Sequence, residues 1–232
     1  MTTRNLLFHC YPIRGSIWPW HVEQLLKYKE VWNGRKIVTI VTDGSTEPAD
    51  QVVKAFLPLG AELFVTKNQS YLAETYHFIE MLQILLESRT DEDATFYAHA
   101  KGVTHNGERV EIVRRWSDLM YRLNLSRPEL IDKKLKTWPV IGCLRERRRH
   151  AGAEWIYSGT FFWMRHDALS SRNWRDILQE RYGVEGYPGR HFKFEESYAL
   201  NPEAVPPDLL YNGWISDEVI ERWTKRLMEE AI

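Results

Sequence analysis

The sequence predicts an α/β protein with a mixed, mainly parallel sheet that carries helices on both faces. In the first hundred residues, short apolar runs alternate with segments of helical periodicity. The runs are apolar throughout, which is typical of parallel strands buried on both faces. Each run ends in a turn rich in glycine or polar residues. This order is typical of a Rossmann-like sheet, whose ligands lie outside the carboxyl ends of the strands.

The predicted elements follow from composition and spacing. In the first half, we expect apolar strands at residues 6–11, 35–42, 61–66 and 95–98, and amphipathic helices at 17–29, 49–57 and 71–87. In the second half, we expect helices at 106–123, 128–135, 176–181 and 217–230, strands at 138–144 and 155–164, a Gly/Pro-rich loop at 183–189 and a proline-rich connection after Glu196. A Ser-Gly pair interrupts the strand at 155–164. We interpret all 232 residues as a single domain.

Composition and charge exclude several classes of function. The formal net charge is −1 and the pI is near 6.7, so no global field favours nucleic acid or an anionic membrane surface, and we expect no nucleic-acid partner. Cys10 and Cys143 lack metal-ligand spacing and give no support for a disulfide framework, which favours a reducing, cytoplasmic location. No apolar run approaches the roughly eighteen residues that cross a membrane, and we expect no transmembrane segment.

Two polar turns follow predicted strands of the first half. Asp43 and Gly44 follow one strand, where a carboxylate can accept hydrogen bonds from a nucleoside and glycine permits close approach. The alternative is a helix-capping turn. His99 and Lys101 follow another strand, where an imidazole and an ammonium can contact phosphate oxygens. The alternative is a histidine satisfied at the sheet edge and a solvated lysine. The sequence contains no Gly-rich dinucleotide fingerprint and no Walker loop.

Several segments together resemble glycosyltransferases of the GT-A fold. Residues 41–47 (VTDGSTE) are similar to the early nucleotide-binding segment of that family. Residues 97–102 (YAHAKG) and 157–163 (YSGTFFW) resemble a group of GT-A-like sugar transferases with an HxKG turn and a YSGxFxW strand. With the opening HCYP at 9–12, the similar segments extend from residue 6 to about 200. The resemblance implies a GT-A-like domain with a nucleotide-binding half at 1–102 and a sugar and acceptor half at 103–232.

The resemblance also implies roles for individual residues. The implied sites are His9, Tyr11, Asp43 and Gly44 for the nucleotide, His99 and Lys101 for the diphosphate, Tyr157, Ser158 and Gly159 for the donor sugar, and Glu195 or Glu196 as the catalytic base. On the residues alone, Gly159 is equally a bulge in a core strand, and adjacent glutamates are more often a helix start. We interpret the basic run at 145–150 as a solvated loop.

One departure from the family pattern affects the cofactor. Metal-dependent members usually carry Asp-x-Asp after the fourth strand, whereas this chain carries His99-Ala100-Lys101 there. An ammonium can itself neutralise diphosphate, so the need for a divalent cation, Mn or Mg, stays open, and no metal ligand is assigned.

The sequence therefore leads to one hypothesis and two alternatives. We expect a glycosyltransferase of hexosyl or deoxyhexosyl type, as in polysaccharide biosynthesis, that moves a sugar from a nucleotide-sugar donor to a glycan or other hydroxyl acceptor. The missing Asp-x-Asp favours an alternative, a non-catalytic nucleotide- or glycan-binding module on the same fold. A methyltransferase is more remote, because its Gly-rich first loop is absent.

Overall fold

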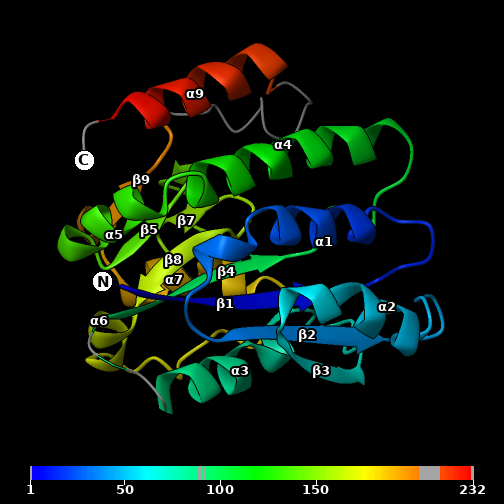
Figure 1. Ribbon diagram of the computed structural model, residues 1–232. Helices are drawn as coiled ribbons and strands as arrows, with labels where there is room; N and C mark the ends of the chain where they lie inside the picture. The colour runs from blue at the N-terminus through cyan, green and yellow to red at the C-terminus, as the bar shows by residue number, and fades with distance from the viewer. Residues whose placement is uncertain (1, 88–89, 91, 204–214, 231–232) are drawn as a thin grey trace.

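The computed structural model describes residues 2–87, 90, 92–203 and 215–230, and its centre is a seven-stranded sheet in the order β3-β2-β1-β4-β8-β5-β9 (Figure 1). The strands are β1 (Thr3–Cys10), β2 (Lys36–Thr42), β3 (Glu62–Lys67), β4 (Asp93–His99), β5 (Val140–Gly142), β8 (Phe162–Arg165) and β9 (Ser197–Ala199). Strands β1 to β4 are parallel, β8 is antiparallel to β4 and β5, and β9 is parallel to β5.

Helices cover both faces of this sheet, so the predicted mixed, mainly parallel α/β fold is confirmed (Figure 1). One face packs against α1 (Trp18–Lys27), α2 (Ala49–Phe56), α4 (Glu108–Leu125), α5 (Pro128–Thr137) and α9 (Asp217–Glu229). The other face packs against α3 (Thr75–Glu87), α6 (His166–Ser170) and α7 (Gly183–His191). Neighbouring strand residues point to opposite faces, so Leu7 joins the core under α3 and Phe8 the core under α1. No helix within the described ranges is long and apolar enough to cross a membrane.

The order of the strands creates a switch point between β1 and β4. From β1 the chain builds outward through β2 and β3, and then returns to place β4 on the other side of β1. Connections that leave in opposite directions open a crevice at the carboxyl ends of the two strands. His9 and His99 are register partners there, at the ends of β1 and β4.

Helix α7 replaces the Gly/Pro-rich loop predicted at 183–189, and this prediction was wrong. Three glycines at helical spacing let α7 lie directly on neighbouring backbone. A Cβ atom at Gly183, Gly186 or Gly189 would lie 2.0–2.3 Å from the carbonyl oxygen of Leu178, Ala151 or Trp155, respectively. The low helix propensity of glycine is therefore outweighed by close packing that only glycine permits. The helix expected at 176–181 is absent, because that segment consists of turns and bends.

The predicted interruption at Ser-Gly in the strand at 155–164 is confirmed. Before it, β7 (Ile156–Tyr157) pairs with β6 (Arg145–Glu146) in a separate two-stranded sheet, and after it β8 joins the main sheet. The expected strand at 138–144 is shorter, as β5. The sequence analysis did not predict α6, β6 or β9. The connection expected after Glu196 falls partly at 204–214, outside the described residues.

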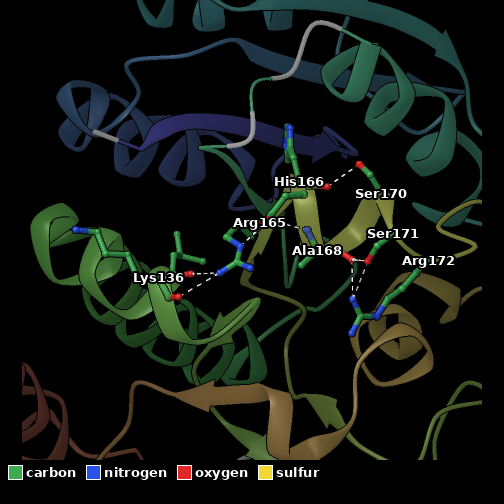
Figure 2. Close-up of polar contacts among 9 residues, drawn as sticks. Lys136, Arg165, His166, Ala168, Ser170, Ser171 and Arg172 are labelled. Atoms are coloured by element: carbon green, nitrogen blue, oxygen red, sulfur yellow. Dashed lines mark hydrogen bonds and ion pairs between the residues drawn. The ribbon is translucent and has the colours of Figure 1, made fainter.

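Two arginines satisfy helix carbonyls at the amino-end edge of the sheet, opposite the switch point (Figure 2). Arg165, at the end of β8, donates from Nη1 to the carbonyl oxygen of Leu135 at 2.7 Å, near the end of α5. Arg172 donates from Nη1 to the carbonyl oxygen of Ala168 in α6 at 2.6 Å. The last carbonyls of a helix have no hydrogen-bond partner within the helix. These two arginines supply that partner and so stabilise the ends of α5 and α6.

Candidate functional site

A pocket of about 320 Å³ lies at the carboxyl ends of β1 and β4. Segments far apart in the sequence form its walls. The end of β1 contributes His9 and Tyr11, and the segment before α3 contributes residues from Asn68 to Glu74. The turn after β4 contributes His99 to His105. The turn before β8 contributes Thr160, and the start of α7 contributes residues from Arg181 to Glu185. We call it the switch-point pocket, because it opens where the topology predicts a ligand crevice.

A buried carboxylate and two histidines form one wall of this pocket. Glu74, the residue before α3, is 8 % exposed and forms an ion pair with Nδ1 of His99. Burial raises the pKa of Glu74, but the charge and hydrogen bond of His99, with the charge of Lys101, lower it below its ordinary value overall. Burial lowers the pKa of His9 to about 4, so His9 is neutral at pH 7. Among the described residues, Nε2 of His99 is buried and has no hydrogen-bond partner.

Lys101 stands on the turn after β4, and the core holds this turn in place. His21 of α1 is buried, and both of its ring nitrogens have a partner. Its Nε2 lies 2.8 Å from the carbonyl oxygen of Lys101, and its Nδ1 lies 3.0 Å from the hydroxyl oxygen of Tyr121. A carbonyl only accepts, so Nε2 carries the proton, and Nδ1 accepts from Tyr121. Gly102 follows in the left-handed region, with φ of 88°.

The Lys101 ammonium is not neutralised by a contact. Its Nζ lies 4.7 Å from the ring centroid of Trp116, and within the described ranges it forms no ion pair. Burial lowers its pKa, while the charges of Glu185 and Glu74 raise it. A half-buried cation in a polar pocket is suited to an anionic ligand.

Asp43 lies at the end of β2 in a dense set of hydrogen bonds. Its two oxygens accept from Tyr11 at 2.7 Å, from Asn68 at 2.7 Å, and from the hydroxyl and amide of Ser45 at 2.6 and 2.8 Å. Desolvation raises the pKa of Asp43, but the hydrogen bonds from Ser45, Asn68 and Tyr11 together outweigh it and lower the pKa well below the ordinary value. Asp43 thus orients Tyr11 and Asn68, both of which line the pocket, although Asp43 itself does not.

Glu185, in the first turn of α7, brings a second carboxylate to the pocket. Its side chain is 12 % exposed, and its Oε2 lies 3.2 Å from Nε2 of His150. Glu185 therefore lies in the same pocket as Lys101, and its contact with His150 restrains the position of its carboxylate.

None of the predicted donor-sugar residues Tyr157, Ser158 and Gly159 lines the pocket, although the residue that follows them does. The Tyr157 hydroxyl donates to the carbonyl oxygen of Tyr198 at 2.8 Å, inside the core, and Ser158 donates to Glu146. Gly159, with φ of 92°, packs so closely on Met120 that a Cβ would lie 2.5 Å from its sulfur. Thr160 follows, also at positive φ, and lines the pocket.

The predicted bases Glu195 and Glu196 lie elsewhere. They immediately precede β9. Through the register of β5 and β8, the first residue of β9 aligns with Thr95 of β4. Glu195 and Glu196 therefore lie toward the amino-end edge of the sheet. Glu195 is exposed and paired with Arg147 at 2.6 Å. Glu196 is paired at 2.6 Å with Arg172, the residue that binds the end of α6 in Figure 2. The structure does not bring either carboxylate to the switch-point pocket.

The basic run at 145–150 is not a uniformly solvated loop, so that interpretation was wrong in part. Arg145 is half-buried and donates to the backbone oxygens of Phe194 and Ser197. His150 holds Glu185, whereas Arg149 is exposed. Desolvation of Arg145 is thus offset by hydrogen bonds that tie β6 to the start of β9.

The residues of the pocket do not fit a metal site. Throughout the described part of the chain, no three His, Cys, Asp or Glu side chains are grouped so that they could hold a metal ion. The segment from His99 to His105 offers two imidazoles and the Lys101 ammonium, and the carboxylate of Glu74 is already paired with His99. No step of the mechanism below therefore involves a metal.

Comparison with known proteins identifies no family. No family model and no curated protein matches the chain. A solved 4-diphosphocytidyl-2C-methyl-D-erythritol synthase is 15% identical, with 99% of this chain and 100% of that chain covered and a TM-score of 0.42. A mannosyltransferase from Pyrobaculum calidifontis, solved with GDP-Man and Mn²⁺, is 13% identical, with 87% and 57% covered and a TM-score of 0.40. At these scores, neither likeness carries an argument about function.

The sequence analysis missed part of the pocket. It did not single out Asn68, Glu74, Thr160 or Glu185, which the fold brings to His99 and Lys101. Asn68 and Glu74 follow β3, a strand end of the kind that already drew attention to Asp43 and His99, so that signal could have found them. Glu185 lies in a segment predicted to be a loop, and no sequence signal placed it near Lys101.

Proposed function

We propose that this protein is a glycosyltransferase that binds a nucleotide-sugar donor in the switch-point pocket. The observation that supports it is the position of that pocket, at the reversal of strand order between β1 and β4, where the Lys101 cation and His99, whose buried Nε2 has no partner among the described residues, line the wall. Crevices of this kind are the usual ligand sites of doubly wound sheets. The resemblance of residues 41–47, 97–102 and 157–163 to GT-A-like sugar transferases supports the choice of a nucleotide sugar.

In this proposal, the nucleoside lies against His9 and Tyr11, with Asp43 and Gly44 forming the turn that supports them. The diphosphate contacts the Lys101 ammonium and Nε2 of His99, whose ring is oriented by Glu74. The donor sugar lies toward Thr160, which lines the pocket and directly follows Tyr157, Ser158 and Gly159.

The reaction needs one proton acceptor and stabilisation of one leaving group. As the acceptor oxygen bonds to the anomeric carbon, its hydroxyl proton passes to Glu185, a carboxylate of the pocket wall. The bond from the anomeric carbon to the diphosphate oxygen breaks, and its electron pair stays with the diphosphate. The fixed charge of Lys101 lowers the energy of that developing anion. Glu185 takes the role that the sequence assigned to Glu195 or Glu196, because of these three only Glu185 lines the pocket.

The test is binding and turnover with a panel of UDP-, GDP-, CDP- and dTDP-sugars. We expect one of them to raise the melting temperature and to release its nucleotide when an acceptor is present. Lys101→Met should weaken nucleoside diphosphate binding about 10- to 100-fold, since a hydrogen bond to a charged group contributes about 1.5–3 kcal/mol. Lys193→Met, at an exposed lysine outside the pocket, is the matched control and should bind normally. No binding across the panel would sink the proposal.

A second candidate is a nucleotide- or glycan-binding module without catalysis. The observation that favours it is the His99-Ala100-Lys101 turn in place of the family's Asp-x-Asp. Tight binding of a nucleotide sugar that is never transferred to any acceptor, nor hydrolysed by water, would favour this module over the enzyme.

A further inference from the structure

A second pocket, of about 470 Å³, shares a wall with the switch-point pocket. Lys101, His105, Tyr182 and Glu185 line both pockets. The remaining lining comes from the first turns of α4 and from the segment between β6 and β7. We call it the α4 pocket. Two pockets that meet at one cation and one carboxylate form an arrangement suited to two substrates that react at the shared wall.

The α4 pocket carries an excess of positive charge. Among the described residues that line it, Lys101, Arg109 and Arg148 are permanent cations, and Glu185 is the one carboxylate. Glu185 is already paired with His150. Arg109 is exposed and forms no ion pair within the described ranges, unlike Arg114 and Arg115 on the same helix, which both bind Glu111. The local charge therefore favours an anion, although the net charge of the chain is −1.

Helix α4 fixes the position of Arg109. Arg109, Ile112, Val113 and Trp116 follow the spacing i, i+3, i+4, i+7 and line the pocket from one face of the helix. Val113 and Trp116 are 4 % and 6 % exposed, so their burial sets the rotation of α4. The Trp116 ring also contacts the Lys101 ammonium. The same packing that holds the helix thus aims Arg109 and Ile112 at the pocket.

We propose that the α4 pocket binds the acceptor, and that this acceptor is a hydroxyl compound carrying an oxyanion group, a phosphate or a carboxylate. The proposal rests on the proposed function, since it places the second substrate of that reaction. The oxyanion binds Arg109 and Arg148, whose planar guanidinium groups match two oxygens of a phosphate or carboxylate. The hydroxyl lies at the shared wall, where Glu185 accepts its proton as the oxygen bonds to the anomeric carbon of the donor.

The experiment uses the full chain and two successive titrations. Calorimetry first measures binding of UDP, GDP, CDP and dTDP. With the tightest of these bound, glucose 6-phosphate, glucuronate and glucose are then titrated as probes. We expect at least one anionic probe to bind at least tenfold more tightly than glucose. The preferred anion, glucose 6-phosphate or glucuronate, distinguishes a phosphate group from a carboxylate.

Matched variants test whether the arginines carry this preference. Arg109→Gln and Arg148→Gln should each weaken binding of the anionic probe about tenfold or more, and should leave nucleoside diphosphate binding within twofold. Arg149→Gln, at the exposed neighbour outside the pocket, should leave both unchanged. Anionic probes that bind no better than glucose, or equal losses in all three variants, would overturn the acceptor proposal while nucleotide binding still supports the enzyme. Failure of every nucleoside diphosphate to bind would overturn both.

Discussion

The switch-point pocket differs in its electrostatics from a cavity of about 400 Å³ beside the start of β9, which is lined in part by Arg147, Arg190 and Glu195. In the β9 cavity, these three charged groups are paired within the fold. Glu195 pairs with Arg147 at 2.6 Å, and Arg190 with Asp176 at 2.9 Å. In the switch-point pocket, the Lys101 ammonium has no ion pair among the described residues, and Nε2 of His99 has no hydrogen-bond partner there.

The difference separates charges that serve the fold from charges that are open to a ligand. Exposed ion pairs such as Glu195–Arg147 contribute little to stability, and their charges are already paired within the fold. A buried polar atom without a partner destabilises the fold, so such an atom in the wall of a pocket is a candidate for contact with a ligand. The adjacency of Glu195 and Glu196 in the sequence is therefore weaker evidence for a catalytic base than the position of Glu185 in the pocket wall.

The largest expected effect contrasts Glu185 with Glu195. Glu185→Gln keeps the shape of the side chain but removes the proton acceptor, and we expect kcat for sugar transfer to fall about 10²- to 10⁴-fold. Glu195→Gln, in the β9 cavity, should change kcat less than twofold. Nucleotide release in the presence of acceptor measures both.

Binding separates this effect from misfolding. The nucleoside diphosphate affinity and the melting temperature of Glu185→Gln should stay close to those of the native protein. Equal kcat losses in the two variants, or a loss confined to Glu195→Gln, would reverse the comparison and restore the base expected from the sequence.

Acid should weaken the fold through histidines near the switch-point pocket. Burial lowers the pKa of His21 from 6.5 to about 3, so the unfolded chain binds a proton below pH 6.5 that folded His21 does not. Stability is thus complete above pH 6.5 and decreases as the pH falls toward 3. By pH 5 the loss is about 2 kcal/mol for this histidine. In His21→Gln, the difference in unfolding free energy between pH 7 and pH 5 should shrink by about that amount in denaturant titrations.

The matched control for this pH effect is a less buried histidine at the β9 cavity. Burial also lowers the pKa of His191, but the backbone oxygen and charge of Asp176 raise it, so His191→Gln should change the pH dependence less. A pH dependence that is the same in the native protein and in His21→Gln would show that His21 is not buried in its neutral form.

Local signals in the sequence determined most of the first half of the fold and little of the second. Strands β1 to β4 are apolar and alternate with periodic helices, so both their type and their parallel arrangement could be predicted. In the second half, β5 to β9 are two to four residues long, too short to show a period. The glycines of α7 indicated a loop by propensity, although here they serve close packing. The position of Glu185 in the pocket depends on this packing of α7 against distant backbone, which no local pattern in the sequence indicates.

The turn that carries Lys101 and the turn that carries Asp43 differ in the space around their glycines, Gly102 and Gly44. Gly102 has φ of 88°, and an added Cβ would lie 2.7 Å from Cγ1 of Val113 and 3.2 Å from Cδ1 of Ile17. Gly102→Ala should therefore reduce the unfolding free energy by about 1–3 kcal/mol and weaken nucleoside diphosphate binding, because Lys101 is displaced. An added Cβ at Gly44 meets no atom within 4 Å, so Gly44→Ala should change stability by less than about 0.5 kcal/mol. Denaturant titration and calorimetry measure both. If Gly44→Ala weakens nucleotide binding as much as Gly102→Ala while the fold stays stable, a ligand approaches the Asp43 turn as closely as it approaches Lys101.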